Sequence, residues 1–241
     1  MIASVINALL VILGSVIGMI FGKKMKGSYL KTINAALAMC VAVIGIQSAL
    51  GTAGIIVVIG CLVIGALIGE LLKIDDGIEK LGDFMKSKIA KHLRSDTSRF
   101  SEGFVTGSLF FCIGSMAIMG TLEAGISHNY SIILAKSVID FASAIAFAAT
   151  MGIGVAFSSI LVLVYQGILT ILAGIIGPYL GAEVVAEMSA VGGIMLLCIA
   201  ANMIEITKER IKVANMLPAM FLPIAYFPLK TLVENLIARV F

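Results

Sequence analysis

Long apolar runs, separated by short polar connections, dominate the sequence. Most runs hold about 20 residues, and a helix of that length spans roughly 30 Å of hydrocarbon. The pattern therefore predicts an all-α polytopic membrane protein with about eight transmembrane helices. The predicted spans cover residues 2–22, 33–50, 55–72, 104–122, 130–155, 158–177, 184–206 and 214–238.

Two of these spans contain residues that interrupt helices. The fourth span holds Gly107, Gly114 and Gly120 within a segment rich in small residues. The eighth holds three prolines: Pro218, Pro223 and Pro228. We predict that both spans are broken helices or re-entrant pairs, whose unwound carbonyl groups could coordinate a cation or a substrate. For each glycine, the alternative is close helix packing.

Composition agrees with a single membrane domain over residues 1–241. The chain is 60% hydrophobic and 13% charged, with a mean hydropathy of +1.12. Its net charge of +3 is not arranged as a basic stripe with interleaved aromatic residues, so the sequence gives no support for nucleic-acid binding. The four cysteines lie inside apolar runs without metal-ligand spacing, and we expect no disulfide, metal site or cofactor.

The basic residues predict an orientation. Fourteen of the 17 lie in three alternate connections, at residues 23–31, 73–99 and 208–212, and the other long connections carry none. Short cytoplasmic loops keep an excess of Lys and Arg, so both termini are predicted to face outward.

The longest predicted inner loop, residues 73–100, is amphipathic. Its apolar residues follow helical spacing opposite lysines: Ile74, Ile78, Leu81, Met85, Ile89 and Leu93. This pattern predicts a helix on the inner leaflet, and the alternative is a solvated linker helix.

Matching residues recur at a separation of 132 to 135 positions. Ser4–Asn7 resembles Ser137–Asp140, and Glu70–Lys73 resembles Glu205–Lys208. The recurrence predicts an internal duplication into two four-helix halves, residues 1–125 and 130–238, related by an axis along the membrane normal. Short apolar matches also arise by chance in such a composition.

One carboxyl group is predicted to lie deep in the bilayer. Asp140 is ten residues into the fifth span, about 15 Å deep at 1.5 Å per residue, and Lys136 is one turn nearer the outside. Ionisable groups cost about 2.5 to 3.5 kcal/mol there, so we predict an ion, proton or substrate site rather than only an ion pair locking two helices. We add Asn7, Gln166, Ser115 and Gly114 as residues that could line the same cavity. The alternative for Asn7 and Gln166 is a hydrogen bond between helices.

We expect a secondary transporter or exchanger of a small polar solute or ion, with an outward-accessible cavity around Asp140. An oligomeric ion channel and a non-transporting scaffold or sensor are the alternatives. Enzyme motifs such as HExxH, GxSxG and the P-loop are absent from the sequence, so an enzyme is not expected.

Several segments resemble a family of bacterial inner-membrane proteins, the YdfK-like or YqgA-like family, which has no assigned function. The similar stretches are Gly107–Gly125, Leu134–Ser158, Tyr165–Thr170 and Ile211–Met220. The resemblance implies a multi-pass protein of the bacterial plasma membrane and identifies neither a substrate nor site residues.

Overall fold

Helices account for all the regular structure in residues 1–90 and 99–240, which are the residues that this computed structural model describes. The α-helices are α1 (Ile2–Lys24), α2 (Gly27–Ala49), α3 (Ile55–Leu72), α4 (Ile74–Ala90), α5 (Phe100–Cys112), α6 (Ser115–Ile126), α7 (Ser131–Met151), α8 (Gly154–Ile176), α9 (Ala182–Met203) and α10 (Leu217–Val240). Two short 3₁₀ helices, η1 (Gly177–Tyr179) and η2 (Val213–Met216), complete the set.

The eight predicted spans correspond to α1, α2, α3, the α5–α6 pair, α7, α8, α9 and α10. Within the residues that the structure describes, six single helices are long and apolar enough to cross a membrane, and α5 with α6 makes a seventh span if the pair is counted as one. The pair is bent by 61°, which confirms the predicted interruption of the fourth span.

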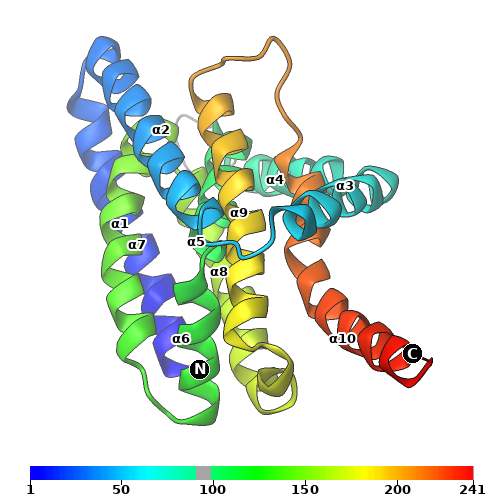
Figure 1. Cartoon of the computed structure of the whole chain (residues 1–241). Helices are drawn as coiled ribbons and strands as arrows, with labels where there is room; N and C mark the ends of the chain where they lie inside the picture. The colour runs from blue at the N-terminus through cyan, green and yellow to red at the C-terminus, as the bar shows by residue number, and fades with distance from the viewer. Residues whose placement is uncertain (91–98, 241) are drawn as a thin grey trace.

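The predicted interruption of the eighth span is wrong at the level of the backbone. α10 continues as one helix through Pro223 and Pro228, although it diverges from the other helices (Figure 1). A proline removes one backbone donor without forcing the chain out of helical geometry, whereas Gly114 in the fourth span adopts a φ of 119° that no helix contains. The difference lies in the backbone dihedral, which the residue type alone does not fix.

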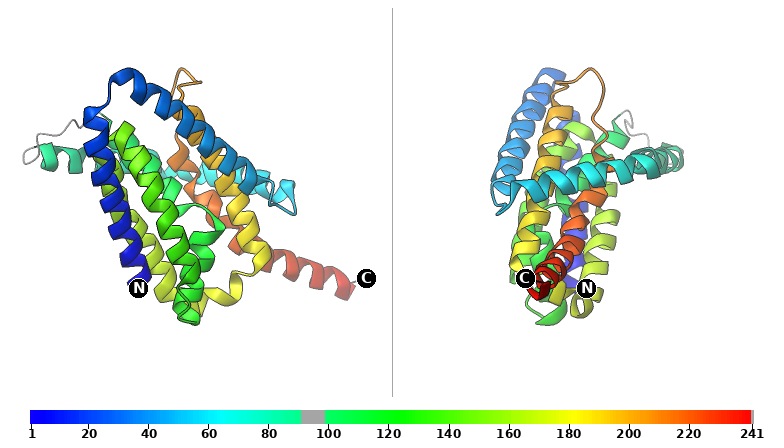
Figure 2. Two further views of the ribbon diagram at one scale, coloured as in Figure 1. Left: turned by 90° about the vertical axis from the view of Figure 1, so that its left-hand side faces the viewer. Right: turned by 45° about the vertical axis from the view of Figure 1, so that its right-hand side comes forward.

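A bundle of long helices forms the centre of the molecule. α1, α7 and α8 pack together, the α5–α6 pair packs on α8, and α9 packs on α2 and α10 (Figures 1 and 2). α3 runs crosswise to the bundle and packs on η2 and α10. The N-terminus lies at the opposite end of the bundle from the α1–α2 and α9–η2 connections.

Three glycines allow α1 to lie directly on α7. A Cβ atom at Gly14, Gly18 or Gly22 would collide with backbone carbonyl oxygens of α7, those of Phe141, Ile145 and Ala149 in the same order. The two series of residue numbers rise together, so the two helices run parallel. In a membrane, where lipid is as apolar as leucine, such close backbone contact supplies much of the packing energy between helices.

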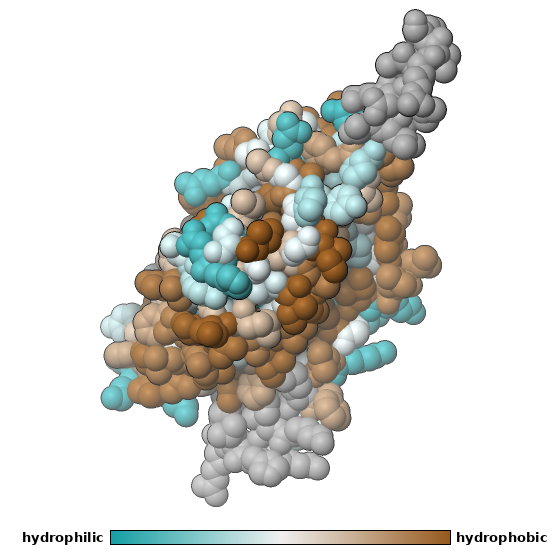
Figure 3. All heavy atoms as spheres, turned by 90° about the horizontal axis from the view of Figure 1, so that it is seen from below, coloured by the Kyte–Doolittle hydropathy of each residue, from teal (hydrophilic) through white to brown (hydrophobic). Residues whose placement is uncertain are grey.

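The outer surface is largely apolar, as a protein embedded in lipid requires. α3 alone exposes a run of large aliphatic side chains: Ile55, Ile56, Ile59, Val63, Ile64, Leu67, Leu71 and Leu72. In the end view of Figure 3, apolar residues cover most of the flanks and hydrophilic residues gather on the end that faces the viewer.

The amphipathic segment forms the predicted helix over residues 74–90. Ile78 packs against the core, while Leu81 is exposed. Leu93 and the side chains of Met85 and Ile89 lie outside what the structure describes.

Two adjacent aspartates attach α4 to the segment that precedes α10. Asp75 accepts hydrogen bonds from Arg210 and from the Ala214 N–H, each at 3.2 Å. Lys212 donates to Asp76 at 3.0 Å, and this hydrogen bond holds the pKa of the Asp76 carboxyl below its ordinary value. The placement of α4 on a leaflet stays a prediction.

Candidate functional site

The predicted carboxyl group lies in a buried polar network between α1 and α7. Lys136 forms a salt bridge with Asp140 one turn along α7. The Asn7 amide of α1 donates a hydrogen bond of 3.0 Å to the same carboxylate oxygen, Asp140 Oδ2. The exposed fractions are 2% for Asp140, 5% for Lys136 and 0% for Asn7. Three residues of the predicted site are therefore in direct contact.

Local sequence explains how the network forms. The i, i+4 spacing places Lys136 and Asp140 on one face of α7, and the glycines of α1 bring the two helix backbones close enough for the short Asn7 side chain to reach Asp140. Burial of a lone carboxylate would cost several kcal/mol, which the ammonium and the amide offset.

The break between α5 and α6 lies at the depth of Asp140. The Phe110 and Phe147 rings of α5 and α7 are in contact, with their centroids 4.9 Å apart, and a Cβ at Gly120 of α6 would lie 3.0 Å from the Ile133 nitrogen of α7. In the α5–α6 pair, Gly114 is about midway between Phe110 and Gly120. On α7, Asp140 is midway between Phe147 and Ile133, so the break and Asp140 lie at the same level. Near the break, the Cys112 thiol is close enough to Lys136 and Asp140 to experience their charges.

Backbone groups at this break are turned out of the helical ladder. Gly114 has φ 119° and ψ 152°, a combination that a residue with a Cβ rarely adopts. The last carbonyl groups of α5 and the first N–H groups of α6 have no intrahelical partner, so opposite partial charges meet at the break. Such half-helix ends can bind a charged or polar group.

The structure does not bring all predicted site residues together. Gln166 is fully buried in α8, and neither polar atom of its amide has a hydrogen-bond partner in the described chain. A Cβ at the neighbouring Gly167 would lie 3.8 Å from Met1, so this stretch of α8 packs near the start of α1. Ser115 is exposed at the break and lines a cavity away from the buried network.

The expected water-filled cavity around Asp140 is not formed by the residues that the structure describes. Asp140 is almost fully buried, and the polar cavities lie elsewhere in this part of the chain. Close packing by the glycines of α1 closes the site, and this packing cannot be read from polar residues alone.

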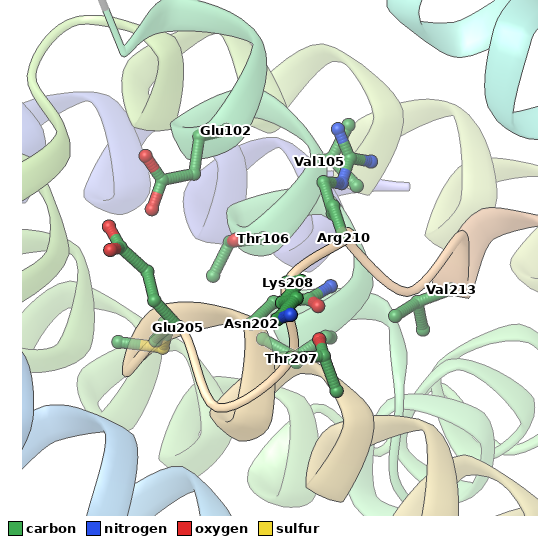
Figure 4. Close-up of a pocket in the computed structure, with 11 residues that line it drawn as sticks. Glu102, Val105, Thr106, Asn202, Glu205, Thr207, Lys208, Arg210 and Val213 are labelled. Atoms are coloured by element: carbon green, nitrogen blue, oxygen red, sulfur yellow. The ribbon is translucent and has the colours of Figure 1, made fainter.

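Two cavities instead lie at opposite ends of the interface between α9 and the α5–α6 pair. The first, of about 490 Å³, lies where the connection at residues 204–212 covers α5 and the end of α9, and we name it the loop cavity (Figure 4). The second, of about 450 Å³, is lined by Ser115 together with Gln47, Ser48 and Ser189, and we name it the break cavity.

An apolar plug separates the two cavities along both helices. Leu109 and Ile113 lie between the α5–α6 residues that line each cavity, and Met195 and Leu196 occupy the corresponding stretch of α9. All four are buried. Ile113 rests on Gly192, where a Cβ would lie 2.6 Å from its Cγ2 atom. A polar path through this interface is closed at the residue directly before the break.

Glu187 of α9 is a further buried carboxylate, 2% exposed, which the sequence pattern did not indicate. It accepts hydrogen bonds from the Thr52 hydroxyl at 2.6 Å and from the Ala53 and Gly54 N–H groups at 2.9 and 3.2 Å. The carboxylate thus satisfies free N–H groups at the start of α3. Its position near a predicted span end made it resemble a loop residue, and only the tertiary contact identifies it.

We expect Glu187→Ala to lower the free energy of unfolding by about 2–3 kcal/mol, because a charged acceptor is lost and buried donors stay unpaired. Thermal unfolding in detergent measures this loss. Glu183→Ala, an exposed position on the first turn of the same helix, is the matched control. Equal unfolding temperatures for the two variants would contradict the role of Glu187.

Taken together, the apolar surface, the bundle and the broken span define a multi-pass helical membrane protein. The family model described as "Protein of unknown function (DUF554)" matches residues 2–227, and the chain belongs to this family. Among relatives, the "Uncharacterized membrane protein YdfK" of Bacillus subtilis (strain 168) is 29% identical over 228 residues, which cover 92% of this chain and 94% of the relative. The "Uncharacterized protein YqgA" of Escherichia coli (strain K12) is 30% identical over 219 residues, covering 90% and 92%. No solved structure gives a significant match. The predicted family resemblance is therefore confirmed.

Proposed function

We propose that this chain is a secondary transporter or exchanger of a small polar solute or ion in a bacterial plasma membrane. The observation that carries the proposal is the break at Gly114, which lies at the depth of the buried Lys136–Asp140 pair. Transporters commonly bind substrate and coupling ion at such interrupted helices near the midplane.

Unused hydrogen-bonding capacity beside Asp140 supports this proposal. Asn7 Oδ1 and, one turn away, Ser4 Oγ are buried without a hydrogen-bond partner among the described residues. Buried polar atoms are normally paired, so orphaned acceptors beside a carboxylate favour a site for a cation or a polar solute.

Because Asp140 is buried away from water, transport through this site requires a change of conformation. Alternating access requires that a site open to one side at a time, and the two cavities with the plug at Ile113 approach the break from opposite ends. The proposal therefore requires a second conformation in which Asp140 reaches water, through movement of α1 or α6 relative to α7.

The proposed orientation has both termini outside. The two lysine-rich connections after α1 and α9 lie at one end of the bundle, and the N-terminus lies at the other (Figure 1). This arrangement agrees with the excess of basic residues in cytoplasmic loops.

Flux into proteoliposomes tests the proposal. The purified chain is expected to give saturable uptake of at least one member of a panel of protons, alkali cations, organic acids, amino acids and nucleobases. Asp140→Asn is expected to slow that uptake by about tenfold or more, since losing one charge-assisted contact costs about 1.5–3 kcal/mol. Asp83→Asn, which changes an exposed carboxylate of α4, is expected to leave the uptake unchanged.

Each alternative gives a different result. Flux that rises without saturation would indicate a channel, and proteoliposomes no more permeable than empty liposomes to the whole panel would contradict transport. An unchanged rate in Asp140→Asn would remove the carboxylate from the mechanism.

A further inference from the structure

Opposite charges stand on opposite walls of the loop cavity. The carboxylates of Glu102 and Glu205 point toward each other on one side, and the cationic groups of Lys208 and Arg210 lie on the other (Figure 4). A ligand that carries both an ammonium and a carboxylate would therefore find an opposite charge for each group.

Two of these four charges make no direct ion pair within the described residues. Glu102 is held by Arg99 through hydrogen bonds of 2.6 and 2.7 Å, and Arg210 is held by Asp75. The Glu205 carboxylate and the Lys208 ammonium have neither a hydrogen bond nor an ion pair within the described residues. Hydrogen bonding to Glu102 raises the pKa of the Arg99 guanidinium, and the Glu205 carboxylate also lies near enough to Arg99 to help raise it. Glu205 and Lys208 thus face the same space as exposed charges without a direct ion pair in the described part of the chain.

The backbone at the C-terminal end of α9 has an unusual conformation that directs Glu205 toward this cavity. The Ile206 N–H donates to the Ala201 carbonyl and the Glu205 N–H to the Asn202 carbonyl, which is the hydrogen-bond pattern of a Schellman motif. Glu205 occupies the left-handed position of the motif, with φ 53°, where glycine is usual. Glu205 therefore occupies a backbone position at which glycine, which has no side chain, is preferred.

An unpartnered hydroxyl also points into the cavity. Thr106 is 7% exposed, its side chain lies between the two charged walls in Figure 4, and no residue in the described part of the chain accepts from it or donates to it. The hydroxyl oxygen is accessible from the cavity, where a polar ligand or water would pair with it.

Four apolar residues of the lining indicate that the ligand also carries an aliphatic group. Val105, Ile199, Met203 and Val213 close the inner part of the cavity, and all four are buried. The volume of about 490 Å³ falls within the usual range for small-molecule sites, roughly 300–1,000 Å³. An aliphatic group fits this inner part, while two charged groups reach the walls.

We propose that the loop cavity binds a free α-amino acid with an aliphatic side chain, whose ammonium contacts Glu205 and whose carboxylate contacts Lys208. The role of this amino acid as transported substrate rests on the proposed function, whereas its binding does not. The position of the cavity makes it the vestibule at the end opposite the N-terminus, separated from the break by the plug at Ile113.

Calorimetry on the purified full chain tests the site with three matched probes. L-leucine carries both charges, isopentylamine lacks the carboxylate, and 4-methylpentanoate lacks the ammonium. We expect L-leucine to bind at least about tenfold more tightly than either half-ligand, a difference of about 1.4 kcal/mol. Glu205→Gln and Lys208→Gln are each expected to weaken L-leucine binding by about tenfold or more. Glu209→Gln, in the same connection but outside the cavity lining, is expected to leave it unchanged.

Several results would overturn the proposal. These are no saturable binding of L-leucine, L-alanine or L-methionine, equal affinity for L-leucine and a half-ligand, or undiminished binding in both glutamine variants. Leucine binding without any proteoliposome flux would instead overturn transport and leave the site intact. If proteoliposome flux depends on Asp140 but L-leucine does not bind, the transport proposal stands and the amino-acid site in the loop cavity is overturned.

Discussion

Gly18→Leu is expected to prevent normal assembly of α1 with α7. A Cβ at this position already overlaps the Ile145 carbonyl oxygen, and the Ile145 carbonyl carbon and Cα lie 2.9 and 3.0 Å from it. These are backbone atoms, so no rotamer change can remove the clash and the helices must separate. We expect a loss of about 3 kcal/mol or more, at or beyond the upper end for overpacking, and a fall in unfolding temperature of about 6–12 °C. Thermal unfolding in detergent, together with the yield of monodisperse protein, measures the effect.

Two glycines provide controls for the Gly18 prediction. A Cβ at Gly174 of α8 or Gly60 of α3 would meet nothing within 4 Å. Gly174→Leu and Gly60→Leu are therefore expected to leave stability unchanged or to raise it slightly through helix propensity. A Gly18→Leu protein as stable as these controls would show that α1 does not pack on α7 as described.

Much of the fold could be predicted from the sequence, because a helix that crosses lipid must be apolar over a fixed length. That constraint placed the helices in the right order, six or seven of which the structure shows to be long and apolar enough to span, and the glycines of the fourth span indicated its break. The prolines of the eighth span suggested a second break that the backbone does not make. In a membrane, a helix can tolerate proline when neighbouring groups satisfy the freed carbonyls, and the sequence does not show those neighbours.

The candidate site was predicted in part. Asp140 and Lys136 could be found because a charge is costly in hydrocarbon, and Asn7 because it matched Asp140 in the proposed repeat. The structure places Asn7 and Asp140 in contact between two parallel helices, as an axis along the membrane normal would, and the duplication itself stays a prediction.

Residues that depend on distant contacts could not be predicted. Glu102 and Glu205 face one cavity only because α5 packs beside the end of α9, and they are separated by about 100 positions in the chain. Near span ends, such residues are indistinguishable by sequence from those that simply face water. Asn34 also makes a distant contact, since its amide donates a hydrogen bond of 2.9 Å to the Met203 carbonyl and so connects α2 with α9.

Lys136→Met is expected to destabilise the protein by about 3–5 kcal/mol, the usual cost of leaving one member of a buried ion pair alone. The Asp140 carboxylate would retain only the Asn7 amide as a donor, and its short side chain cannot reach the membrane surface. Asp140→Asn is expected to cost less, because Lys136 lies five residues from the start of α7 and its long chain can extend toward that end. Thermal unfolding of the two variants measures this asymmetry, and equal losses would contradict it.

The double variant Lys136→Met/Asp140→Asn separates a structural pair from a functional one. With no charge left to compensate, and with the introduced amide still within reach of Asn7, we expect most of the stability lost in Lys136→Met to return. If the pair only locks α7 in place, this folded double variant should also transport at the wild-type rate. If Asp140 binds or releases an ion, as we propose, the protein should be stable and inactive. Wild-type flux in the stable double variant would therefore refute the carboxylate mechanism, whatever the single variants do.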